Sequence, residues 1–141
     1  ATVAMIETRF GRAFGLIVVD ACVDGPRRSV PLTLALDTGS TETVICPWVV
    51  DAIGHSVRDA EQLTRVRSAV GDEQGYTLRV DQFAALGFAH ARFLVHVFDL
   101  PEGYGIDGLV GLSFLDRLNY EVRSADNLFR AALVSSAVSD G

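Results

Sequence analysis

The stretch Leu34-Ala35-Leu36-Asp37-Thr38-Gly39-Ser40-Thr41 is the most informative part of this sequence. It completes a run, residues 29–37, in which valine and leucine recur at every second position from 30 to 36. Such alternation is typical of a β-strand, because successive side chains of a strand point to opposite faces. We therefore predict a strand that delivers the carboxylate of Asp37 away from the leucine-bearing face, into a short turn of small and hydroxyl residues.

Outward from this stretch, the pattern is that of a mostly-β single domain. Further strands are predicted at residues 14–23, 41–46, 93–100, 120–123 and 128–133, separated by glycine and proline. Residues 63–70 and 76–80 predict a hairpin whose flexible tip is the glycine-bounded segment 71–75. Residues 47–53 predict a short helix, with Pro47 at its first position and Gly54 just past its end. One or two helical turns are expected at residues 112–118.

A second glycine motif follows about seventy residues after the first. The segment IDGLVGLSFL, residues 106–115, contains the pair Leu109 and Val110 followed by Gly111. Together with the Asp-Thr-Gly stretch and the hairpin between them, this segment resembles the aspartic proteases, and the helix at residues 47–53 resembles their bacterial retropepsin-like branch. The resemblance covers residues 14–133. It implies a closed acid-protease (retropepsin-like) barrel with a flap hairpin and one or two short helices, in a domain of residues 1–134 followed by a flexible tail, residues 135–141.

The resemblance also implies a reaction and a role for each motif residue. Aspartic proteases place two carboxylates side by side, and these share one proton because two such close charges cannot both ionise. Asp37 is then the catalytic carboxylate. Thr38 resembles the residue that joins two active-site loops across a two-fold axis. Gly39 lets its backbone N–H approach the carboxylate, and the hydroxyl of Ser40 is expected to donate to it and lower its pKa.

The chain contains one Asp-Thr-Gly motif where the mechanism needs two carboxylates. Asp107 lacks the following hydroxyl residue and is interpreted as a turn residue. The resemblance therefore implies a homodimeric endopeptidase in which both chains supply Asp37. Substrate peptide is expected to contact Val70, Gly71 and Gly75 of the flap and Leu109 and Val110 of the second motif.

Two features depart from the retroviral enzymes and fit the bacterial branch better. Leu112 follows the glycine of the second motif, where retroviral enzymes have a polar or charged residue. The expected flap tip is polar, Asp72-Glu73-Gln74, rather than rich in glycine. A different function is also compatible with the sequence: a non-catalytic protein-binding or assembly domain that keeps the protease fold.

The remaining reactive side chains give weaker signals. Cys22 and Cys46 are expected to be buried free thiols, with a disulfide between them left open. His90 and His96 can share a strand face, but no third ligand stands at metal spacing, and nothing supports a thiol nucleophile at Cys46 beyond its nearness to a histidine. We expect neither metal nor cofactor. Trp48 is interpreted as a core anchor or an interface residue.

The charge and hydropathy of the chain indicate which kinds of binding partner to expect. The 141 residues carry a net charge of −6 and contain no basic block, so nucleic acid and anionic membranes are not expected partners. Mean hydropathy is +0.28, which is somewhat apolar for a soluble monomer. Either the many alanine, valine and leucine residues or an apolar interface covered by a partner explains this value. No apolar run approaches the ~20 residues of a membrane helix, and no secretory signal is visible. We expect a cytoplasmic rather than a secreted location, with an anchor or signal upstream of Ala1 left open.

Overall fold

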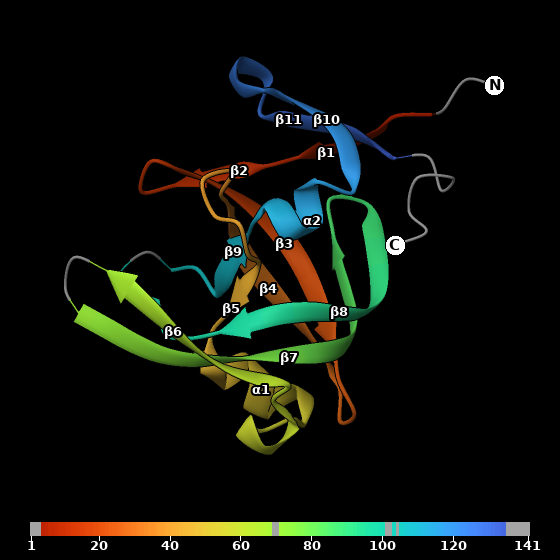
Figure 1. The fold of residues 1–141 in the computed structure, drawn as a ribbon. Coiled ribbons are helices and arrows are strands. Elements are labelled where there is room, and N and C mark those ends of the chain that lie inside the picture. The colour runs from red at the N-terminus through yellow and green to blue at the C-terminus, as the bar shows by residue number, and fades with distance from the viewer. Residues whose placement is uncertain (1–3, 69–70, 101–102, 104, 135–141) are drawn as a thin grey trace.

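The computed structural model describes residues 4–68, 71–100, 103 and 105–134, and within them residues 66–68 and 71–73 by their backbone alone. In this part of the chain, strands far outnumber helical segments (Figure 1). The smaller sheet has three strands, in the order β1 (Ile6–Arg9), β11 (Leu128–Leu133) and β10 (Leu118–Arg123). The larger sheet has eight strands, in the order β2 (Gly11–Ala13), β3 (Leu16–Asp24), β4 (Ser29–Leu36), β9 (Gly108–Val110), β5 (Val44–Ile45), β8 (Phe88–Val97), β7 (Gly71–Ala85) and β6 (Gln62–Ser68).

The larger sheet closes on itself. β3 pairs with β4 on one side and with the far end of β7 on the other, in the register Ala21↔Ala85 to Asp24↔Gln82. This closure places the apolar faces of β3, β4, β7 and β8 around one core, which α2 (Leu112–Leu115) enters with Phe114. Each large apolar side chain buried there contributes about 1.5–3 kcal/mol. The prediction of a closed, mostly-β fold with short helices is confirmed.

Two local predictions match the structure closely. In β4 the side chains of Val30, Leu32 and Leu34 are buried, as the alternation indicates. α1 (Pro47–Ile53) begins with its proline and ends at Gly54, whose φ of 94° is the left-handed conformation that glycine adopts without strain. Two single-turn 3-10 helices, η1 (Val57–Asp59) and η2 (Ser124–Asp126), complete the described elements.

Other expectations were wrong or lie outside the described residues. Trp48 is 49% exposed and is therefore not a core anchor. The N-terminal strands β1 and β2 were not predicted, because they are short and carry little apolar periodicity. The domain boundary at residue 134 stays a prediction, since residues 135–141 are not described.

The tip of the β6–β7 hairpin is not where the glycines suggested. Ser68 pairs with Gly71 and Thr64 pairs with Gly75, so residues 71–75 belong to strand β7. Gly75 is buried, and a Cβ there would collide with the backbone oxygen of Val97 on β8. This glycine therefore permits the close approach of two strands and does not form a turn. The expectation of a flexible loop at residues 71–75 was wrong.

Strand β9 lies between β4 and β5 and gives the sheet its central crossing. It runs parallel to β4, with Leu34↔Gly108 to Leu36↔Val110, and antiparallel to β5, with Val44↔Leu109. The loop that joins β4 to β5 must therefore pass over the end of β9. A Cβ at Gly108 or Gly111 would collide with the backbone oxygen of Val44 or Glu42, respectively. The two glycines of the second motif are thus required by the crossing itself.

A buried hydroxyl network fixes this crossing. Thr43, fully buried, accepts hydrogen bonds at Oγ1 from the backbone N–H of Gly111 at 3.2 Å and from Oγ of Ser113 at 2.9 Å. The N–H of Thr43 in turn donates to Oγ of Ser113 at 3.1 Å. A buried polar group without a hydrogen-bond partner destabilises the fold, and in this network each of these polar groups has a partner. The network ties the loop after β4 to the start of α2.

A histidine is built into the aromatic part of the core. The ring of His90 lies 5.4 Å from that of Phe114 and 6.1 Å from that of Phe93, centroid to centroid. Its Nε2 is buried and has no hydrogen-bond partner among the described residues. Burial lowers the pKa of His90, and the charge of Arg117 lowers it further. The folded chain therefore favours the neutral imidazole.

We predict that Thr43→Val destabilises the fold by about 1–3 kcal/mol, because it leaves the N–H of Gly111 and the hydroxyl of Ser113 without their acceptor. Thr77→Val is the matched control: Thr77 is also buried, but its hydroxyl makes only a 3.5 Å contact to the oxygen of Gln62. Urea unfolding of both variants measures the difference. Equal losses of stability would show that the network contributes nothing specific.

We also predict that His90 makes the fold less stable in acid. A histidine whose pKa is lowered by folding binds more protons in the unfolded chain, so stability falls as the pH falls from about 6.5 towards the lowered pKa. His90→Phe removes this proton uptake and keeps an aromatic ring in the cluster. Its free energy of unfolding, compared with that of the wild type, should improve between about pH 7.5 and pH 5. A difference that does not change with pH contradicts this prediction.

Candidate active site

Asp37 stands directly after β4, at the crossing with β9. Its backbone N–H donates to the carbonyl oxygen of Val110 at 2.9 Å, which continues the β4–β9 pairing by one residue. Its carboxylate oxygen Oδ1 accepts from the N–H of Gly39 at 2.9 Å. Asp37 is half-buried, so the carboxylate is held by backbone groups and remains open to solvent. The sheet and the turn therefore fix the position of the Asp37 carboxyl group.

The Asp-Thr-Gly turn itself faces outward. Thr38 and Gly39 are exposed, and the turn closes with the N–H of Ser40 donating to the oxygen of Asp37 at 3.2 Å. A Cβ at Gly39 would lie 3.2 Å from Oδ1 of Asp37, a tight approach that glycine avoids. The expected close contact between the Gly39 backbone and the carboxylate is therefore present.

The hydroxyl of Ser40 has a different partner from the expected one. Its Oγ donates to the backbone oxygen of Glu42 at 2.8 Å rather than to Asp37. Serine readily bonds to backbone groups two residues away, and this local acceptor is available whatever the rest of the fold does. Ser40 therefore supports the loop, and the expectation that its hydroxyl donates to the Asp37 carboxylate was wrong.

The second motif supports the loop through its backbone. The N–H groups of Leu112 and Ser113 donate to the oxygens of Ser40 and Thr41 at 2.8 and 2.9 Å. Val110 is fully buried in the core. Its side chain is therefore not available to a ligand. Leu109, the other predicted contact, is half-buried and can be reached by a ligand.

The flap residues predicted to contact substrate are placed only in part. Gly71 opens strand β7, and Gly75 is packed against β8. Val70 lies outside the described residues. Arg65 and Thr64, on the facing strand β6, line a cavity beside the loop of Asp37, residues 37–43, and the sequence did not suggest this cavity.

This cavity, of about 270 Å³, lies between the loop of Asp37 and the β6–β7 hairpin. Ser40, Thr41 and Glu42 form one wall and β6 the other. Inside it, Oε2 of Glu42 lies 3.1 Å from Nε2 of His96 on β8. The parallel pairing of β5 with β8 places His96 opposite Val44, and no motif in the sequence indicated this pairing.

Asp107 is structural, as the sequence suggested. Its Oδ2 accepts from the N–H of Thr33 at 2.9 Å, and its own N–H donates to the oxygen of Thr33 at 2.8 Å. It therefore closes the turn before β9 and does not join Asp37 as a second reacting carboxylate.

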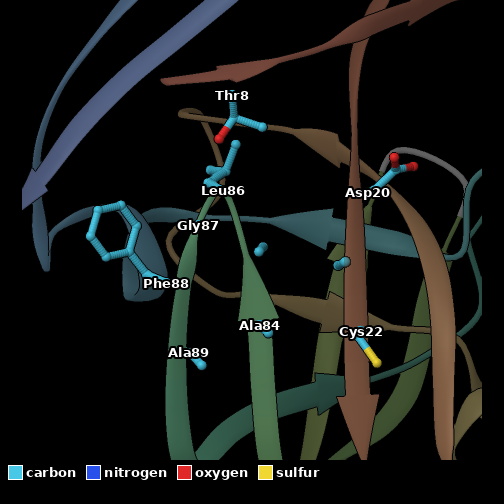
Figure 2. A pocket seen from close by; sticks show the side chains of 10 residues that line it. Thr8, Asp20, Cys22, Ala84, Leu86, Gly87, Phe88 and Ala89 are labelled. Atoms are coloured by element: carbon cyan, nitrogen blue, oxygen red, sulfur yellow. The ribbon is translucent and has the colours of Figure 1, made fainter. Parts of the chain in front are cut away.

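A larger cavity, of about 480 Å³, lies elsewhere, over the β3–β7 junction (Figure 2). Asp20 and Cys22 of β3 line it together with the turn at Leu86 and Gly87, and its lining is mostly alanine and other apolar residues. None of the site residues predicted from the sequence borders it.

The cysteines and histidines form no reactive centre in the described part of the chain. Cys22 and Cys46 are free and half-buried rather than fully buried. Burial raises the pKa of the Cys46 thiol, and the carboxylates of Asp107 and Asp99 raise it further, which disfavours a thiolate nucleophile. No three His, Cys, Asp or Glu residues among those described gather to hold a metal. None of the described helices is long and apolar enough to cross a membrane.

Comparisons with known proteins agree with this geometry. A family model described as "Aspartyl protease" matches residues 19–114, which include both Asp37 and Gly111. The fold is similar to a retropepsin-like aspartic protease from Rickettsia conorii, with a TM-score of 0.64, 18% identity and coverage of 94% of this chain and 97% of that one. It is also similar to the retroviral protease-like domain of Ddi1 from Leishmania major, with a TM-score of 0.56, 14% identity and coverage of 87% and 97%.

A search of curated protein sequences found no significant match. The two structural neighbours, at such low identity, establish the retropepsin-like fold that the sequence predicted. The family model spans well over half of the chain and includes the whole loop of Asp37 and strand β9, which crosses it. This protein belongs to the aspartyl protease family.

Proposed function

We propose that this protein is an aspartic endopeptidase whose active site forms when two copies bring their Asp37 carboxylates together. The observation that carries the proposal is the geometry of the Asp37 carboxylate. It is anchored by the Gly39 N–H at 2.9 Å and presented to solvent by a turn whose other residues, Thr38 and Gly39, are exposed. The carboxylate of Asp37 bonds within its own turn, whereas Oδ2 of Asp107 accepts from the N–H of Thr33 and so ties two distant parts of the chain together.

The reaction follows from two carboxylates that share one proton. The ionised carboxylate takes a proton from a water molecule between the two, and the water oxygen attacks the carbonyl carbon of the peptide bond. The protonated carboxyl donates its proton to the carbonyl oxygen. The tetrahedral intermediate then transfers a proton to the leaving nitrogen, the C–N bond breaks, and the dyad returns to its starting state. No covalent enzyme intermediate, metal or cofactor is needed.

Peptide substrate would lie between the catalytic loop and the β6–β7 hairpin. The half-buried Leu109 and the cavity containing Glu42 and His96 border this space. In this hairpin, residues 62–68 of β6 pair with residues 71–77 of β7, which is long enough to cover an extended peptide. Closure of such a hairpin would exclude water other than the reacting molecule.

Asp37→Asn should abolish peptide cleavage, with a loss of at least roughly 10²–10⁴-fold, because it removes the acid–base group and leaves the backbone bonds of the loop in place. Asp107→Asn is the matched control: an amide oxygen can still accept from Thr33, so activity should persist. Cleavage of a peptide library, with thermal unfolding to confirm folding, gives the measurement. Full activity in pure Asp37→Asn protein would refute the catalytic role of Asp37. A folded wild type that cleaves no peptide would instead favour a protein-binding domain.

Activity should depend on both pH and enzyme concentration. The rate should follow a bell with its optimum on the acidic side of neutral, because the dyad fails when its single negative charge is protonated and when its shared proton is lost. Specific activity should fall on dilution, since each site needs two chains. A pH–rate profile at several enzyme concentrations tests both features. A flat profile, or activity unaffected by dilution in a demonstrated monomer, excludes the shared dyad.

A further inference from the structure

The cavity beside the loop of Asp37 contains a carboxylate paired with an imidazole. Glu42 is half-buried, and its Oε2 lies 3.1 Å from Nε2 of His96 on β8. The backbone N–H of His96 donates to the carbonyl oxygen of Thr43 at 2.9 Å, so the backbone holds β8 and the loop together beside this pair. Among the described side chains, His96 is the ion-pair partner of Glu42. The carboxylate therefore has a defined place on the cavity wall.

The charge that this wall presents depends on His96. A neutral imidazole donates a hydrogen bond to the carboxylate without cancelling its charge, whereas a protonated imidazole compensates it. The other charged side chain that lines the cavity is Arg65, which is exposed and therefore screened by solvent. The neighbours of His96 on β5 and β7, Val44 and Thr77, carry no charge. The half-buried part of the cavity is therefore anionic while His96 is neutral.

The rest of the lining suits a long side chain with a polar end. Val44 and the half-buried Phe98 give the cavity apolar surface. Thr64 also lines it, and its Oγ1 is buried with no hydrogen-bond partner among the described residues. Lysine and arginine side chains lay their methylene stems along apolar surface, and their charged ends carry several hydrogen-bond donors. Such a side chain would complement the carboxylate and give the unpaired hydroxyl a donor.

We propose that Glu42 makes this protein prefer substrates with a lysine or arginine side chain in the cavity, and that His96 sets the pH range of that preference. The inference rests on the proposed function, because it requires peptide to lie between the loop of Asp37 and the β6–β7 hairpin. In a two-fold dimer the cavity occurs twice. The preference should therefore appear at two positions of the substrate, one on each side of the cleaved bond.

The test compares lysine with norleucine, which has a similar apolar stem and no charge, at each position of a peptide in turn. At about pH 7.5 the ratio of kcat/KM should favour lysine by about threefold or more at two positions, since partly exposed charge pairs have effects of this size. The ratio should fall towards one at about pH 5, because protonated His96 then compensates Glu42. Titration of the Asp37 dyad affects both peptides alike and cancels in the ratio.

Three variants assign the effect to its residues. Glu42→Gln should remove the preference at every pH, while the backbone oxygen that accepts from Ser40 is kept. His96→Gln keeps an uncharged donor beside the carboxylate, so the preference for lysine should persist at about pH 5. Glu121→Gln is the matched control, because Glu121 lies in the smaller sheet, bonded to Arg130, and the ratio should not change.

Binding gives a readout that does not depend on cleavage. Non-cleavable peptides with a statine unit at the cleaved bond, carrying lysine or norleucine, are titrated into wild type and Glu42→Gln, and fluorescence anisotropy gives each Kd. A wild type that binds the lysine peptide more tightly through Glu42 and cleaves nothing supports this inference and contradicts the protease. A wild type that cleaves with the same ratio as Glu42→Gln overturns the inference and leaves the protease standing.

Three other results also count against the inference. Equal Kd values for the lysine and norleucine peptides in a wild type that cleaves neither overturn it together with the proposed activity. A preference for glutamate over glutamine that is lost in Arg65→Gln overturns it, because the cavity would then select acidic side chains. A preference that depends on Glu42 and is the same at about pH 5 and about pH 7.5 overturns the role of His96.

Discussion

The crossing of β9 between β4 and β5 is the constraint on which the rest of the structure depends. β9 pairs with β4 in parallel and with β5 in antiparallel register, so the loop between those two strands has to pass over its end. The carbonyl oxygen of Val110 then meets the N–H of Asp37 at 2.9 Å. The catalytic candidate is thus positioned by the backbone of the sheet, and its loop has little freedom to place the carboxylate elsewhere.

Such a crossing is demanding because it brings polar backbone into the core. The hydroxyls of Thr43 and Ser113 form hydrogen bonds with polar groups that have no partner in the sheet. Gly108 and Gly111 have no side chain, and the neighbouring carbonyl oxygens occupy that space. A buried donor without a partner costs about 1–3 kcal/mol, so an alternative arrangement of the loop would be penalised at each of these positions. Thr38 and Gly39, on the outer side of the loop, are exposed and are not constrained in this way.

Two features are not explained by local sequence preference: the turn at Leu86 and the presence of a single Asp-Thr-Gly motif. Consistency between local preference and packing is the rule in folded chains, and departures from it concentrate at functional positions. Leu86 departs from turn preference because its φ is positive, and its burial in the core compensates for this departure. The family to which the chain belongs and its one Asp-Thr-Gly motif are the grounds for our proposal of a site shared between two copies.

The sequence by itself determined the features that depend on near neighbours. The alternation before Asp37, the proline and glycine that bound α1 and the closeness of Gly39 to the carboxylate are local effects, so residue order suffices to predict them. The tertiary structure decided what each remaining glycine and hydroxyl does. A glycine suits a turn and also suits a close approach of strands, and only the position of β8 shows that Gly75 serves the second purpose. Likewise Ser40 could bond to a carboxylate or to a carbonyl, and the folded loop brought the carbonyl of Glu42 within reach.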